Sequence, residues 1–209
     1  MSKFREILVP GDYFHVFNRA VGNEKLFLVE DNYYYFLELF QKYISPVSDL
    51  FSYSLLPNHF HFFLRFNNSE EIFKQVEKLK YSYQELHMQP KFLLQQFSNF
   101  FNAYTKSFNF QFGRKGKLFI EPFCRRLVNN PDYYTKLVHY VHSNPVHHGL
   151  SKKVESWPHS SYHSIVSEQN NFVKADEVIK WFGSVESFVK FHDQPVMKKT
   201  KSSLIYSLR

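Results

Sequence analysis

Two histidines separated by a single residue stand in an otherwise apolar stretch of the chain. Residues 57–66 read PNHFHFFLRF, with His59 and His61 on either side of Phe60. Side chains alternate across a β-strand, so the two imidazoles should share one face while Phe60 and Phe62 point to the other. Two imidazoles on a rigid strand could begin a metal site, which needs at least one further protein ligand. Without that ligand, they would be two partly exposed histidines on a sheet surface.

A later segment, residues 129–145, has the start and stop signals of a helix. Asn130 can serve as its N-cap, and Pro131 then occupies the first helical position, where a missing N–H does no harm. Asp132 suits the positive end of the helix dipole. Pro145 is expected to end the helix.

This predicted helix carries polar side chains along the edge of its apolar face. At about 100° per residue, Tyr133, Tyr140 and Asn144 form one strip, and Tyr140 and Asn144 are one turn apart. If the apolar side packs on the sheet, the strip can lie beside His59 and His61. That arrangement would give a metal bound by two histidines and Asn144, with the Tyr140 hydroxyl next to it. Taken alone, Tyr140 is one of 14 tyrosines and could be structural.

The elements that must position these side chains follow from residue patterns. Strand-like runs occur at 13–20, 50–57, 59–66 and within 112–128. Helical patterns occur at 31–44, 69–87, 90–109 and 129–145, with one or two short helices within 175–192. The order of these elements predicts an α+β fold in which helices cover an antiparallel sheet. We expect a catalytic domain over residues 1–150 and a small helical appendage with a basic tail over 151–209.

The composition favours a polyanionic partner. The chain has 209 residues, a formal net charge of +7 and 44% hydrophobic residues, enough to bury a sizeable core. The residues expected to contact phosphates are Arg114, Lys115, Lys117, Arg125 and Arg126. A solvated basic loop is the alternative interpretation of the same residues.

Cysteine content and hydropathy exclude several classes of protein. Cys124 is the single cysteine, so neither a disulfide within the chain nor a cysteine-based zinc site is possible. No apolar run approaches the roughly 20 residues that a membrane-spanning helix needs. We therefore expect a cytoplasmic protein without a membrane partner.

Three sequence segments resemble one known family. LLPNHFHFFLRF resembles the HUH motif (His, bulky hydrophobic, His) of single-strand DNA transposases. YFHVFNRAVGNEKLF near the start and LVHYVHSNPVHHGL later are also similar to that family, specifically to its single-tyrosine group, which includes the REP-associated tyrosine transposases. The resemblance covers about residues 10–165.

The resemblance implies a fold and a set of roles. It implies a ferredoxin-like core whose sheet carries the histidines, with His59 and His61 binding Mg²⁺ or Mn²⁺. It implies that Tyr140 is the nucleophile. Asn144 occupies the position where relatives place a third metal ligand, although some of them have Gln there.

Three functional hypotheses follow. The first is a metal-dependent endonuclease and strand transferase that acts on single-stranded or hairpin DNA through a 5′-phosphotyrosyl intermediate, as a monomer or homodimer. Lys136, His139 and His142 are candidates to assist deprotonation of Tyr140. The second is a catalytically inactive, domesticated protein that only binds a DNA hairpin. The third is a metal-dependent hydrolase of RNA or another substrate that uses water, and a requirement for Tyr140 separates the first hypothesis from the others.

Overall fold

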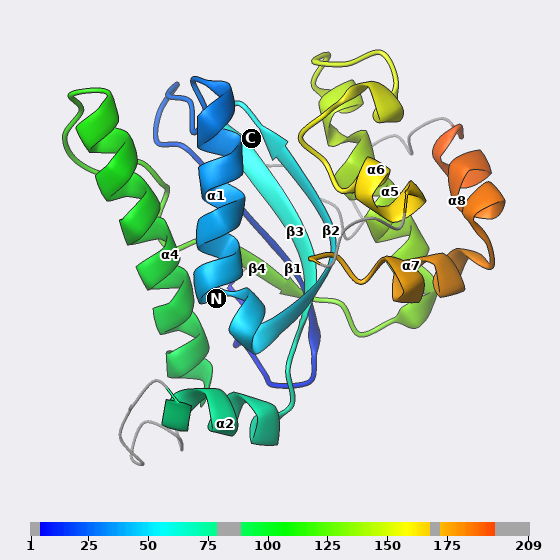
Figure 1. Cartoon of the computed structure of the whole chain (residues 1–209), viewed down its shortest axis with the longest axis horizontal. Coiled ribbons are helices and arrows are strands. Elements are labelled where there is room, and N and C mark those ends of the chain that lie inside the picture. The colour runs from blue at the N-terminus through cyan, green and yellow to red at the C-terminus, as the bar shows by residue number, and fades with distance from the viewer. Residues whose placement is uncertain (1–4, 79–88, 168–171, 195–209) are drawn as a thin grey trace.

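A four-stranded antiparallel sheet forms the centre of the molecule (Figure 1). The computed structural model describes residues 5–78, 89–167 and 172–194. Its strands are β1 (Tyr13–Arg19), β2 (Ser48–Leu56), β3 (His59–Phe66) and β4 (Cys124–Leu127). Their order in the sheet is β2-β3-β1-β4. Helices follow β1 and β3 in the chain, so the connectivity is the ferredoxin-like βαββαβ pattern and the predicted α+β fold is confirmed.

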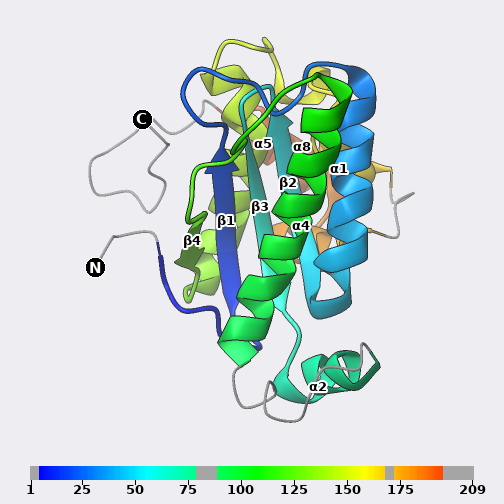
Figure 2. The ribbon, with the colours of Figure 1, turned by 90° about the vertical axis from the view of Figure 1, so that its left-hand side faces the viewer.

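Helices cover both faces of this sheet. On one face lie α1 (Glu30–Tyr43) and α4 (Gln89–Gln111), which run side by side (Figure 2). The opposite face is covered by α5 (Tyr134–His147) and by three short helices (Figure 1). The three short helices are α6 (Tyr162–Val166), α7 (Ala175–Phe182) and α8 (Val185–His192). Helix α2 spans Ser69–Lys78, and the remainder of the predicted 69–87 helix lies outside the described part of the chain.

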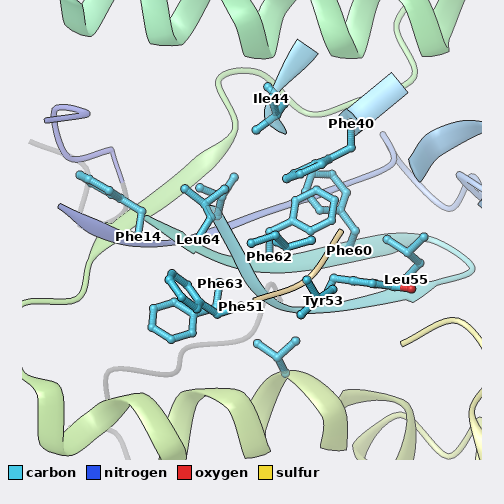
Figure 3. Close-up of a cluster of buried hydrophobic side chains, with 14 of the residues drawn as sticks. Phe14, Phe40, Ile44, Phe51, Tyr53, Leu55, Phe60, Phe62, Phe63 and Leu64 are labelled. Carbon is cyan, nitrogen blue, oxygen red and sulfur yellow. The ribbon is translucent and has the colours of Figure 1, made fainter. Parts of the chain in front are cut away.

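The alternation of β3 distributes its side chains between two apolar layers. Phe60 and Phe62 point toward α1, where the ring centre of Phe62 lies 4.5 Å from that of Phe40. Phe63 points to the other side, toward α5, and contacts Phe51 there (Figure 3). Both layers exclude water, which explains why these strands have nearly continuous apolar sequences.

The segment after residue 150 completes the outer edge of the sheet. The backbone N–H of Leu55 on β2 donates to the carbonyl of His159, and the N–H of Ser161 donates to the carbonyl of Tyr53. Unpaired edge groups are costly when buried, so these bonds stabilise β2. The boundary at residue 150 stays a prediction, and the basic tail of residues 195–209 lies outside the described residues.

Helix α5 does not stop at Pro145 as the sequence predicted. The helix continues to His147, with Pro145 inside its last turn. A proline there removes one hydrogen-bond donor, but the turn is closed by other bonds: the N–H of Leu150 donates to the carbonyl of Pro145 at 2.9 Å. Gly149 permits this closure because its φ of 68° lies in the left-handed region. The Asn130 side chain caps the preceding 3₁₀ turn, as expected.

None of the helices in the described ranges is long and apolar enough to cross a membrane.

We predict that Phe62→Ala lowers the free energy of unfolding by about 3–5 kcal/mol, because the fully buried ring leaves a cavity between the sheet and α1. Urea denaturation followed by circular dichroism measures this change. Phe110→Ala is the matched control, since its ring is 91% exposed, and should change stability by less than about 0.5 kcal/mol. Equal effects of the two substitutions would contradict the core assignment.

Candidate active site between the sheet and helix α5

The fold brings the two histidines of β3 together with the tyrosine of α5. His59 and His61 share the face of β3 that looks toward α5, and their ring centres are 5.3 Å apart. The ring of Tyr140 stands edge-on to that of His61, with centres 5.7 Å apart. All three side chains are at most 6% exposed. Residues separated by some eighty positions in the chain therefore form one buried cluster, as the helix-strip argument predicted.

A third histidine, His15 on β1, belongs to the same cluster. Its Nε2 lies 2.9 Å from Nδ1 of His61, and the two rings are stacked. Burial lowers the pKa of His15 to about 3, with a further contribution from the charge of Arg126, and lowers the pKa of His61 well below its ordinary value. Both imidazoles are therefore neutral, and the N–H of one ring donates to the nitrogen of the other. The sequence analysis missed His15, although the alternation of YFHVF on the first strand could have placed it on this face.

The histidine pair of β3 fits the donor chemistry of a metal site. The Nδ1 atom of His61 is hydrogen-bonded to Nε2 of His15, and Nδ1 of His59 lies 2.7 Å from the side-chain oxygen of Asn58. A ligating histidine commonly uses its second ring nitrogen in this way, which fixes the ring orientation. His148 lies nearby, with its ring centre 4.7 Å from that of His59.

A larger metal cluster is absent from this part of the molecule. Within the described residues, no group of three or more His, Cys, Asp or Glu side chains is arranged to hold a metal ion. A site of two histidines and one asparagine does not need such a group.

Asn144 lies one turn beyond Tyr140, where the strip argument placed it. Its side-chain amide nitrogen donates to the backbone carbonyl of Tyr140 at 2.9 Å. The amide nitrogen is thus engaged within α5, so the side-chain oxygen is the atom of Asn144 that could bind a metal. Its role as a ligand stays a prediction.

The phenol of Tyr140 is buried and poorly solvated. Its hydroxyl oxygen has no hydrogen-bond partner of normal geometry among the described residues. Burial raises the pKa of Tyr140 to about 12, and the neighbouring Asn144 amide offsets part of the rise. Deprotonation therefore needs assistance. The buried hydroxyl also means that a substrate can reach it only after neighbouring groups move.

One histidine of α5, His142, has a structural position. Nε2 of His142 lies 2.7 Å from Oγ of Ser161, and its Nδ1 lies 2.9 Å from Nε2 of His192 on α8. His142 is fully buried. The chain of contacts ties the helix that carries Tyr140 to β2 and α8, and both ring nitrogens of His142 are engaged by residues other than Tyr140.

The two arginines of β4 point in different directions. Arg126 lies opposite His15 in the sheet register, and its charge acts on both His15 and Tyr133. Arg125 is 9% exposed, and its guanidinium donates to the backbone carbonyls of Glu6 and Phe123. Arg126 is therefore placed beside the candidate site, while Arg125 holds the N-terminal segment on β4.

In the basic loop after α4, carboxylates of the protein neutralise two of the three predicted phosphate-binding cations. Arg114 forms an ion pair with Glu24 and donates to the side chain of Asn109, so its guanidinium stabilises the loop. Lys117 pairs with Glu121 in an exposed contact that contributes little. Lys115 is exposed and forms no ion pair with a described residue. Of these three cations, Lys115 is the one best placed to meet a phosphate without losing a partner.

Comparison with known proteins adds one structural relative. No protein-family model matches the chain, and no curated protein matches its sequence. Among solved structures, the chain is similar to that of a REP-associated tyrosine transposase bound to a REP hairpin, with a TM-score of 0.58. The match covers 99% of this chain and 100% of that chain, at 17% sequence identity. The resemblance seen in the sequence segments therefore extends to the fold of the whole chain.

We predict that the buried histidine of α8 makes the protein less stable in acid. Burial lowers the pKa of His192 to about 3, whereas the unfolded chain takes up this proton near pH 6.5. The free energy of unfolding should therefore fall as pH drops from about 6.5 toward 3. His192→Gln removes the proton site, so the slope between pH 6 and 4 should become shallower by up to about 1.4 kcal/mol per pH unit.

Urea denaturation at a series of pH values measures this slope. The substitution His163→Gln, at an exposed histidine, is the control and should leave the pH dependence near that of the unmodified protein. An unchanged slope for His192→Gln would show that His192 does not stay neutral in the folded state.

Proposed function

We propose that this protein is a metal-dependent, tyrosine-nucleophile DNA endonuclease and strand transferase. The observation that carries this proposal is the buried cluster of His59, His61 and Tyr140, assembled from β3 and α5. The fold adds support, because it is shared over the full length with a tyrosine transposase structure. We place the activity in the cytoplasm, in line with the sequence expectation.

The reaction assigns a separate task to each member of the cluster. His59 and His61 would hold Mg²⁺ or Mn²⁺, with Asn144 as a further ligand. When bound, such an ion supplies stabilisation for the negative charge that develops on the phosphoryl group. The Tyr140 oxygen attacks phosphorus, its proton leaves, and the bond from phosphorus to the 3′ oxygen breaks. The products are a 5′-phosphotyrosyl link and a free 3′-hydroxyl, so the bond energy is kept for resealing.

Two properties of Tyr140 constrain this mechanism. Its pKa of about 12 means that the phenol is almost entirely protonated at neutral pH. Its buried hydroxyl means that attack must follow a rearrangement around α5. A cation held by His59 and His61 would lower the pKa of Tyr140, because an opposite charge nearby favours the phenolate.

The proposed substrate is single-stranded or hairpin DNA. The net charge of +7 favours a polyanion, and Arg126 lies opposite His15 beside the site. The similar transposase structure contains a REP hairpin, which makes hairpin DNA the first substrate to test. A protein that only binds the hairpin is the alternative, and the adduct experiment below separates the two.

We predict that Tyr140→Phe abolishes formation of a covalent adduct while leaving DNA affinity within about twofold of that of the unmodified protein, because only the hydroxyl is removed. The protein is incubated with Mn²⁺ and 3′-labelled hairpin oligonucleotides, and label that resists denaturation is located by peptide mass. Tyr134→Phe is the matched control, because its ring packs on Tyr13 away from His61. Cleavage by Tyr140→Phe without an adduct would indicate a water-using hydrolase, and binding without cleavage by the unmodified protein would indicate a binding module.

We predict that His61→Ala weakens Mn²⁺ binding by at least about tenfold, because one imidazole ligand is lost. Calorimetric titration of the protein with Mn²⁺ in the absence of DNA measures this affinity. His163→Ala, at an exposed histidine distant in sequence from the cluster, is the control and should bind Mn²⁺ normally. Unchanged Mn²⁺ affinity in the double variant His59→Ala/His61→Ala would remove the metal site from the mechanism.

A further inference from the structure

An arginine at the end of β1 lies directly beside the candidate metal ligands. Arg19 is the last residue of β1 and is paired with His59 in the antiparallel register. Directly opposite residues of an antiparallel pair share one face, with Cβ atoms about 4.5–5.5 Å apart. Arg19 therefore lies on the α5-facing side of the sheet, next to His59.

The guanidinium of Arg19 has few partners. Its Nη2 donates to the backbone carbonyl of Gly22 at 3.2 Å. Its Nε is buried and has no hydrogen-bond partner among the described residues. No described carboxylate lies within ion-pair distance of it. A partly buried cation with an unmet donor carries a desolvation cost that a bound anion would reduce.

At the other end of the same sheet face, Arg65 is an arginine whose charge is neutralised by carboxylates within the protein. Arg65 on β3 lies 2.7 Å from a carboxylate oxygen of Asp49 and 3.2 Å from one of Glu177. Its guanidinium also lies over the ring of Tyr13. Two carboxylates thus neutralise Arg65 within the protein. Arg19 has neither, although both arginines lie on the face of the sheet that α5 covers.

The surroundings of Arg19 connect the cluster with the basic loop. The N–H of Ile120 donates to the carbonyl of Arg19, and the N–H of Val21 donates to the carbonyl of Leu118, both at 3.0 Å. The chain that leaves the loop of Lys115 is therefore joined to the end of β1. These bonds fix the backbone of Arg19, so the Cα of Arg19 is held between the loop and His59.

We propose that Arg19 is a substrate-binding residue that holds the phosphodiester attacked by Tyr140. Its guanidinium carries parallel N–H donors that match two oxygens of a phosphate, which a lysine cannot reproduce. The inference rests on the proposed function, because it takes the attacked group to be a phosphodiester of a nucleic-acid strand. The phosphodiester would supply an acceptor for the buried Nε of Arg19.

The test measures binding without turnover, in the Tyr140→Phe protein. The probe is a single-stranded hairpin oligonucleotide that the unmodified protein cleaves, and a second probe carries an uncharged methylphosphonate at the cleaved position. We expect Arg19→Gln to weaken binding of the first probe by about tenfold or more. The methylphosphonate should weaken binding by a similar factor when Arg19 is present and have little further effect in Arg19→Gln. Arg19→Lys should fall between the two.

Arg65→Gln is the matched control, because it removes the same charge from the same face of the sheet. It should lower the melting temperature and leave the penalty for the methylphosphonate unchanged. Equal affinity of Arg19→Gln and its parent, or a full methylphosphonate penalty in Arg19→Gln, would overturn the assignment. If Arg19→Gln does not fold, the same comparison made with Arg19→Lys decides it.

A failure of the Arg19 assignment can be distinguished from a failure of the proposed function. If the unmodified protein binds the hairpin but forms no adduct, the nucleophile assignment fails. Methylphosphonates placed at each position of the bound strand then show whether any phosphate depends on Arg19. The absence of such a position would overturn the inference as well.

Discussion

The packing of α5 against the sheet is the interaction on which the candidate site depends. The apolar side chains of α5 are buried against β2 and β3, and this contact holds Tyr140 beside His61. The contacts from His142 to Ser161 and His192 fix the helix further. Without this packing, the phenol and the imidazoles would belong to separate surfaces, and neither could act on the same phosphate.

The same packing gives the site its unusual electrostatics. Exclusion of water keeps His15 and His61 neutral, which is the state in which an imidazole can bind a metal. It also raises the pKa of Tyr140, which opposes formation of the phenolate. The closed arrangement thus keeps the imidazoles unprotonated and the phenol protonated. In the proposed mechanism, a cation at His59 and His61 could reverse the second effect, because a nearby positive charge lowers the pKa of a phenol.

The charged side chains on the α5-facing side of the sheet divide into two groups. Arg65 is paired with acidic side chains. Arg126 and Arg19 instead lie beside the histidines at positions opposite His15 and His59. Positive charge is therefore concentrated beside the candidate histidines, where a phosphate would reduce its cost.

The sequence determined the local features of this protein. The alternation of β3 placed His59 and His61 on one face, and helical spacing placed Tyr140 and Asn144 on one strip, because both periodicities are properties of the backbone. The order of the elements also predicted the fold class. These features depend only on residues that are near one another in the chain.

The tertiary structure decided what lies across from those residues. The register between β1 and β3 set His15 against His61 and Arg19 against His59, and the register between β1 and β4 turned Arg126 toward the site. A register depends on cooperative packing between distant segments, so no local periodicity encodes it. The burial of Tyr140 was decided in the same way, because it arises only once α5 is packed on the sheet.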